Sequence, residues 1–241
     1  MKEDVKLVDL VIELVDARAP LASRNPDIDS LAAGKGRVIL LNKADLASEK
    51  ANAAWISYFE GQGLQVMKID ARAKATLKQL NALIQEACKE KIERDRRRGI
   101  LNRPVRAMVV GIPNVGKSTF INSFAGKAAA KTGNKPGVTK GNQWIRLNKQ
   151  VELLDTPGIL WPKFEDQKVG LLLAFLGSIN DEILEKDELA SELAGYLKEI
   201  ATARACLTKG GVNDLTKAAR LLLDEFRGGK LGRITLEMPA E

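Results

Sequence analysis

Residues 111–118 read Gly111-Ile112-Pro113-Asn114-Val115-Gly116-Lys117-Ser118 and match the phosphate-loop pattern GxxxxGK(S/T). The apolar run 105–110 predicts a buried strand before this stretch, and residues 117–124 predict a helix after it. The backbone N–H groups at the helix start should therefore wrap phosphate groups, with the Lys117 ammonium on the β- and γ-phosphates. The expected contacts are Asn114, Val115, Gly116, Lys117, Ser118 and Thr119. The alternative is a glycine-rich turn without a ligand.

A second stretch, Asn42-Lys43-Ala44-Asp45, follows the apolar run 37–41 and predicts recognition of guanine. A carboxylate can accept hydrogen bonds from guanine N1–H and N2–H₂, which adenine does not offer. We therefore expect Asp45 to read the base, Asn42 to contact O6 or N7 and tie the loop together, and the Lys43 stem to lie along the base plane. All four residues are expected to contact GTP or GDP.

A further base contact is expected after the run 64–69, which reads as another strand. Asp70 and Ala71 follow this run and fit the backbone contact that recognises guanine O6. Serine or threonine is more usual in GTPases where Asp70 stands.

Two stretches are candidates for the segments that sense the γ-phosphate. Asp155-Thr156-Pro157-Gly158 follows the run 151–154, where an aspartate can hold Mg²⁺ through water and a glycine N–H can contact the γ-phosphate. Thr139, in Lys135-Pro136-Gly137-Val138-Thr139, can complete the Mg²⁺ shell only when that phosphate is present. The expected Mg²⁺ ligands are Ser118, Thr139 and Asp155, with Thr139 preferred to Thr132. The alternative for Thr139 is an ordinary threonine in a turn.

The chain contains no histidine, so no imidazole of its own can act as a general base. Ile159 stands where Ras-like GTPases carry a glutamine that orients water, and isoleucine cannot hydrogen-bond water. We expect slow intrinsic hydrolysis, with Lys117, Thr139 and Gly158 as the catalytic positions. The Asn114 carbonyl oxygen is a candidate ligand for K⁺, and the alternative is an amide that stabilises the loop.

The order of these motifs is inverted. In ordinary GTPases the phosphate loop comes first, whereas here the guanine motif at 42–45 precedes the loop at 111–118. All the elements lie at strand ends, in the order base, base, phosphate, switch, switch. This order predicts a circularly permuted GTPase domain.

Strand and helix patterns alternate up to residue 154 and then give way to helices. The alternation predicts an α/β fold with a mostly parallel sheet and helices on both faces, in a GTPase domain of residues 1–177. Residues 178–241 are expected to form a small all-helical C-terminal domain that responds to movement of Gly158. The expected strands are 10–15, 37–41, 64–69, 105–110, 143–147 and 151–154; the expected helices are 48–60, one long helix from 76 to 98, 117–124, 168–176, 187–200 and 215–226.

Composition restricts the class of protein. Apolar residues make up 45% of the 241, and no apolar run is long enough to span a bilayer, which predicts a globular protein. The N-terminus lacks a signal-peptide pattern, and the separated Cys88 and Cys206 suit a reducing cytosol. The net charge of +7 favours a polyanion such as nucleic acid, or simply keeps the protein soluble. The basic run 89–106 is open to the same two interpretations, phosphate contact or a solvated helix face.

Taken together, 42–45, 111–118, Asp16-Ala17-Arg18-Ala19-Pro20 and the stretch 155–162 resemble the ribosome biogenesis GTPase A family (YlqF/RbgA type) along nearly the whole chain. The resemblance implies a cytoplasmic bacterial GTPase that acts late in assembly of the large ribosomal subunit. It further implies binding to large-subunit rRNA and ribosomal proteins, and stimulation by the ribosomal particle. Ile159 is similar to the hydrophobic residue that replaces the catalytic glutamine in this family. The family's usual N-terminal segment, whose histidine is implicated in hydrolysis, has no counterpart in this sequence.

Two other functions stay open from the sequence. One is a GTP-dependent binding module with negligible hydrolysis that docks a protein or membrane partner. The other is an RNA-binding protein with a vestigial nucleotide site, which the intact Lys117, Ser118 and Asp155 disfavour.

Overall fold

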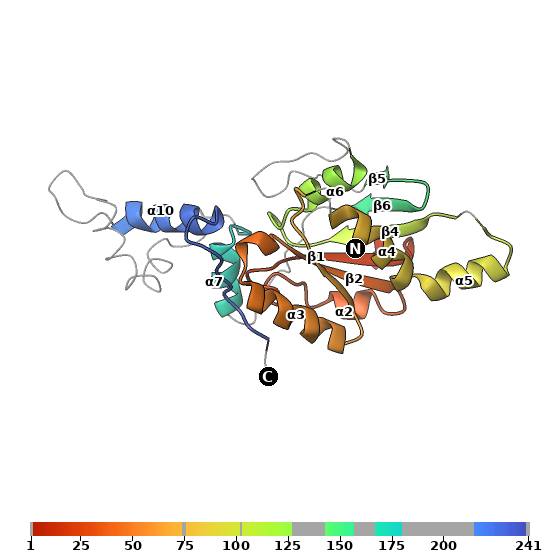
Figure 1. Ribbon diagram of the computed structural model, residues 1–241, viewed down its shortest axis with the longest axis horizontal. Coiled ribbons are helices and arrows are strands. Elements are labelled where there is room, and N and C mark those ends of the chain that lie inside the picture. Colours follow the sequence, from red (N-terminus) through yellow and green to blue (C-terminus); the bar gives the residue numbers. More distant parts are fainter. Residues whose placement is uncertain are drawn as a thin grey trace.

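A mostly parallel sheet forms the centre of the protein, with helices on both faces (Figure 1). The computed structural model describes residues 2–73, 76–101, 103–126, 143–156, 167–179 and 215–239. Within them the strands are β1 (Leu10–Asp16), β2 (Gly36–Asn42), β3 (Gln65–Lys68), β4 (Val105–Val110), β5 (Gln143–Arg146) and β6 (Val151–Asp155). Their order in the sheet is β3-β2-β1-β4-β6-β5, and β5 runs antiparallel at one edge.

The described helices confirm most of the expected helical segments. They are α1 (Lys2–Lys6), α2 (Ile28–Leu31), the 3₁₀ helix η1 (Ala44–Leu46), α3 (Glu49–Gly61), α4 (Thr76–Ala87), α5 (Lys89–Arg97), α6 (Lys117–Ala125), α7 (Gln167–Phe175) and α10 (Leu215–Arg227). The helix expected at 187–200 lies outside the described residues. Among those residues, no helix has the length and apolar character needed to cross a membrane.

The register of the parallel strands brings the motifs to one edge of the sheet. Asp16, at the end of β1, pairs with Asn42 at the end of β2. β4 lies on the other side of β1 and ends at Val110, directly before the phosphate loop, while Asp155 of β6 pairs with Val109. Because parallel strands end at the same edge, the loops that follow β1, β2, β4 and β6 are neighbours in space.

Apolar side chains fill the space on both faces of the sheet. All seven residues of β1 are buried, as expected for a central parallel strand. On one face, Ile12 belongs to a cluster with Leu80 of α4 and Phe120 of α6. On the other face, Val15 belongs to a cluster with Trp55 of α3. Leu10, Ile12 and Leu14 of β1 belong to the first cluster, whereas Val11 belongs to a third cluster with Met108 of β4, so alternate residues of β1 face opposite sides of the sheet.

The long helix expected from 76 to 98 is wrong in one respect, because the structure divides it at Cys88 into α4 and α5. Cys88 is buried, with only 3% of its surface exposed, and packs against Gly36 at the start of β2. A single straight helix would have to keep Cys88 in this buried contact and also keep the charged side chains of α5 in solvent. The chain bends at Cys88, and α5 extends away from the sheet (Figure 1).

The last described segment, residues 228–239, returns to the loops that follow β1 and β2 (Figure 1). The Leu236 N–H donates to the Arg18 carbonyl at 2.6 Å, and the Ile234 N–H donates to the Leu46 carbonyl at 3.1 Å. Other bonds of this segment are Trp55 Nε1–H to the Glu237 carbonyl, Ser48 N–H to Thr235 Oγ1, and Leu21 and Ala22 N–H to the Glu237 carboxylate. The C-terminal segment is thus part of the same packed unit as the base motif.

We expect Arg18→Ala to destabilise the protein by about 3 kcal/mol, because it leaves part of a buried ion pair uncompensated. Arg18 is 1% exposed, donates to the Asp16 carboxylate, and lies 4.9 Å from the centre of the Phe226 ring. Urea unfolding followed by tryptophan fluorescence measures the change. The matched control is Arg97→Ala on α5, since Arg97 is largely exposed. Equal unfolding free energies for the two variants would contradict this role of Arg18.

Candidate nucleotide-binding site

The phosphate loop joins β4 to α6, as the sequence predicts. Gly116 has φ = 100° and directly precedes α6, so this position suits glycine. A Cβ added at Gly116 would collide with the Asn42 side chain, and one at Gly111 would lie 2.7 Å from the Leu14 carbonyl oxygen. Glycine therefore allows the loop to approach both the base motif and β1.

Lys117 of this loop and Asp155 at the end of β6 are two buried charged groups that interact electrostatically. Lys117 is 8% exposed and Asp155 is 2% exposed. Burial lowers the pKa of Lys117 to about 8, against the opposing effect of the Asp155 charge. Burial likewise raises the pKa of Asp155, against the opposing effect of the Lys117 charge. Bound phosphate groups would stabilise the charged form of Lys117, and a bound cation would stabilise the charged form of Asp155.

The residues at this position fit a Mg²⁺ ion. Asp155 Oδ1 is buried and has no hydrogen-bond partner among the described residues, so it is an oxygen ligand in need of a donor or a cation. Ser118 lies in the first turn of α6 and offers a hydroxyl oxygen. Mg²⁺ prefers such hard oxygen ligands and usually keeps waters and substrate phosphates in its shell. The described part of the chain contains no cluster of three or more His, Cys, Asp or Glu side chains placed to hold a metal.

The base motif contacts the phosphate loop directly. Asn42 Nδ2–H donates to the Val115 carbonyl at 2.7 Å, and the Lys43 ammonium donates to the Asn114 carbonyl at 3.0 Å. Asn42 Oδ1 also accepts from the Ala71 N–H at 3.0 Å, so this one amide joins three loops. The sequence predicts that Asn42 ties its own loop together, and the structure shows that Asn42 contacts two further loops. The base motif and the phosphate loop therefore lie side by side.

Asp16 forms an ion pair with the Lys43 ammonium, a role that we did not assign from the sequence. Asp16 Oδ2 accepts from the Lys43 ammonium at 2.8 Å and from Arg18 Nη2 at 2.8 Å. Burial alone would raise the pKa of Asp16, but the charges and hydrogen bonds of Lys43 and Arg18 outweigh it and hold that pKa far below its usual range. Lys43 has φ = 58°, so the ion pair also secures an unusual backbone conformation. The only sequence signal was the stretch 16–20 after a strand.

Asp45, the last residue of the base motif, lies in η1 and is partly exposed. Within the described ranges its Oδ1 is buried without a hydrogen-bond partner, whereas its Oδ2 accepts from Arg72 Nη2 at 2.7 Å. Asp70, from the expected O6-contact pair, also bonds to Arg72. The N–H of Ala71, the other residue of the stretch expected to contact guanine O6, donates to Asn42 Oδ1. Its contact with the base stays a prediction.

Asn114 connects the phosphate loop to the end of α7. Its Nδ2–H donates to the Gly177 carbonyl at 2.6 Å, and Asn114 has φ = 60°. This bond is the loop-stabilising role named as the alternative to K⁺ binding, although a cation would contact the amide oxygen rather than the nitrogen. The other expected phosphate-sensing positions, Thr139 and Gly158, and also Ile159, lie outside the described residues.

Comparison with known proteins agrees with this geometry. A family model described as a 50S ribosome-binding GTPase matches residues 106–204, which include the phosphate loop and Asp155. A Bacillus cereus protein named Ribosome biogenesis GTPase A is 46% identical over 99% of this chain and 89% of its own length. The chain belongs to the ribosome biogenesis GTPase A family.

Other members of the ribosome biogenesis GTPase A family match along their length. The protein of that name from Thermotoga maritima is 34% identical over 100% of this chain and 90% of its own. A structure described as GDP-bound TM YlqF superposes with a TM-score of 0.77 at 31% identity, covering 100% of this chain and 99% of that one. The GNP-bound YlqF from T. maritima gives a TM-score of 0.74 at 32% identity, covering 100% and 97%.

For this member of the ribosome biogenesis GTPase A family, we expect GDP affinity to fall about threefold between about pH 7.5 and about pH 8.5. Lys117 has a pKa of about 8 without nucleotide, so above that pH it must take up a proton to pair with phosphate. Isothermal titration without Mg²⁺, in buffers of different ionisation enthalpy, measures both affinity and proton uptake. Constant affinity with no proton uptake over this range would contradict the prediction.

Proposed function

We propose that this protein is a GTP-hydrolysing switch that assists a late step in assembly of the large ribosomal subunit, in the bacterial cytoplasm. The observation that carries the proposal is the pair of hydrogen bonds from Asn42 and Lys43 to the phosphate loop. They support a single site in which a guanine motif and a phosphate motif act on one nucleotide. The matched relatives are named as ribosome biogenesis GTPases, which supports the cellular role.

In this proposal Asp45 reads guanine, and Lys117 contacts the β- and γ-phosphates of GTP. Ser118, Thr139 and Asp155 hold Mg²⁺, which supplies charge neutralisation at the phosphates. Gly158 contacts the γ-phosphate through its N–H. The residues proposed to line the nucleotide are Asn42, Lys43, Ala44, Asp45, Asp70, Ala71, Asn114, Val115, Gly116, Lys117, Ser118, Thr119 and Gly158.

We also propose that the GTPase domain is circularly permuted, with residues 1–177 as that domain and residues 178–241 as a helical effector domain. The order of the motifs supports the permutation, since 42–45 precedes 111–118. Two hydrogen bonds support coupling between the parts. Arg227 of α10 donates to the Phe175 and Ala174 carbonyls at the end of α7.

We expect faster GTP turnover in K⁺ than in Na⁺, by about tenfold, if Asn114 helps to place a monovalent cation against the phosphates. The cation would add positive charge where Ile159 cannot orient water. Phosphate release from the wild type and from Asn114→Ala, in matched chloride salts, measures the effect. Equal rates in the two salts for the wild-type protein would remove the proposed K⁺ site.

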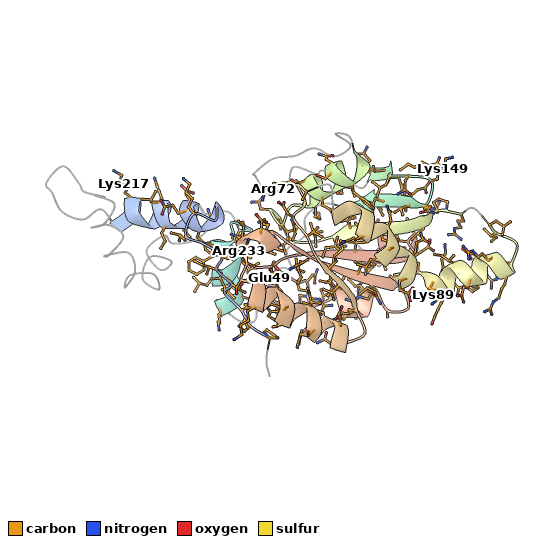
Figure 2. All side chains as sticks on the ribbon, in the orientation of Figure 1. Glu49, Arg72, Lys89, Lys149, Lys217 and Arg233 are labelled. Carbon is orange, nitrogen blue, oxygen red and sulfur yellow. The ribbon has the colours of Figure 1, made fainter. Side chains whose placement is uncertain are left out.

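Contact with rRNA is the least direct part of the proposal. Within α5, Lys91 pairs with Asp9 at 3.1 Å and with Asp95 at 3.0 Å, so part of the basic run is neutralised inside the protein. The other basic side chains of α5 are exposed, and the helix projects from the sheet beyond its first residue, Lys89, which Figure 2 labels. A phosphate backbone could reach this projection, and salt-dependent binding would be its signature.

Co-sedimentation with large ribosomal subunits tests the proposed function. We expect retention with a non-hydrolysable GTP analogue, loss with GDP, and loss for Lys117→Ala in both states. Hydrogen exchange across residues 178–241 in the two nucleotide states tests the effector role, and identical protection would argue against it. Failure to bind subunits in any nucleotide state would favour a GTP-dependent binding module for another partner.

A further inference from the structure

A carboxylate occurs at position 70, where GTPases more often carry a hydroxyl, and it lies beside the carboxylate proposed to read guanine. A hydroxyl can donate a hydrogen bond to a neighbouring carboxylate, but an ionised aspartate can only accept. Like charges at short distance repel, so Asp70 would disturb Asp45 unless a cation lay between them. The described structure places such a cation there.

Arg72 bridges the two carboxylates. Its Nε and Nη2 donate to the two Asp70 oxygens at 2.8 and 3.0 Å, and the same Nη2 donates to Asp45 Oδ2 at 2.7 Å. The Arg72 backbone N–H also donates to Asp70 Oδ1 at 2.9 Å, which fixes the Asp70 side chain within its own turn. The Arg72 guanidinium thus makes two parallel hydrogen bonds to Asp70 and one further hydrogen bond to Asp45.

The arrangement leaves the other Asp45 oxygen, Oδ1, buried and without a hydrogen-bond partner in the part of the chain that the structure describes. A buried oxygen of this kind is costly unless a donor fills it. Guanine offers two adjacent donors, N1–H and N2–H₂, that match the two oxygens of one carboxylate. Oδ2 has a second lone pair, so it can accept from the base while Arg72 holds it.

We infer that Arg72 is a positioning residue that orients Asp45 for guanine and neutralises the adjacent Asp70. This inference rests on the proposed role of Asp45 in reading the base. The Arg72 hydrogen bond lowers the pKa of Asp70, which keeps that carboxylate ionised beside Asp45. Arg72 itself is well exposed, with 69% of its side-chain surface accessible, so salt should screen part of its effect.

The test compares binding of GDP and IDP to the purified protein by isothermal titration. IDP lacks the N2 amino group, so the ratio of the two dissociation constants reports the second hydrogen bond to Asp45. For Arg72→Ala we expect about tenfold weaker GDP binding and a smaller IDP/GDP ratio, because Asp45 is repelled and no longer held. The loss should shrink in high salt. Arg97→Ala, on α5 at the far end of the domain from the labelled Arg72, is the matched control (Figure 2).

The decisive variant is Asp70→Ser with Arg72→Ala. Removal of the second carboxylate removes the need for Arg72, so GDP affinity and the IDP/GDP ratio should return to within about threefold of the wild type. Unchanged or tighter GDP binding by Arg72→Ala would overturn the inference, as would a double variant no better than the single one. The Asp45→Ala variant distinguishes failure of the base assignment from failure of the role of Arg72. If Asp45→Ala keeps the wild-type IDP/GDP ratio, the base assignment itself fails; if it loses that ratio while Arg72→Ala does not, only the role of Arg72 fails.

Discussion

Lys117→Ala should weaken GTP and GDP binding by about 10³-fold, which corresponds to about 4 kcal/mol. Lys117 is buried beneath the phosphate loop, and its ammonium is the positive side chain that the structure places beside Asp155. Without it, the phosphates would enter a buried site that keeps the Asp155 carboxylate without its counter-charge. Fluorescence titration with a labelled GDP measures the loss.

The same variant should not unfold the protein. Burial lowers the pKa of Lys117 to about 8, so the lysine costs folding free energy in the absence of phosphate. Lys117→Ala should therefore unfold near the wild-type temperature without nucleotide, because the desolvation cost that it removes is offset by the counter-charge that Asp155 loses. Lys149→Ala is the matched control, because Lys149 is exposed in the turn between β5 and β6 (Figure 2). Nucleotide affinity within a few-fold of the control would contradict the assigned role.

Asp45→Asn should lower GDP affinity by about 100-fold and raise affinity for xanthosine diphosphate above that for GDP. An asparagine amide can accept from one base donor, but its NH₂ group meets the guanine amino group with a like donor. Xanthine carries a carbonyl at that position and accepts from the new amide. Competition titration with the two nucleotides measures the inversion, and Asp27→Asn, at an exposed position, controls for loss of surface charge. Undiminished preference for GDP would undercut Asp45 as the base reader.

The sequence predicted those parts of the site that are local. The phosphate loop and the base motif each occupy a short stretch at the end of an apolar run, so their type and place could be read without the fold. The parallel register then determines that they meet, as the pairing of Asp16 with Asn42 shows. The inner strands β1, β2, β4 and β6 follow for the same reason, since buried parallel strands are nearly continuous apolar runs.

Contacts between distant segments could not be predicted in this way. The ion pair between Lys43 and Asp16 depends on β1 and β2 lying side by side. The return of the C-terminal segment depends on bonds such as Leu236 N–H to the Arg18 carbonyl, between residues over two hundred positions apart. The bend at Cys88 depends on a buried contact with Gly36 that helical periodicity does not contain.

A crystal structure with GDP and Mg²⁺ would test the shared nucleotide site most directly. We expect guanine N1 and N2 within hydrogen-bond distance of the Asp45 carboxylate and the β-phosphate in contact with the Lys117 ammonium of the same molecule. A single site built from the two motifs would be contradicted by density in which Lys117 contacts the phosphates but the purine lies away from Asp45. Density in which Asp45 contacts the purine but the phosphates lie away from Lys117 would contradict it equally.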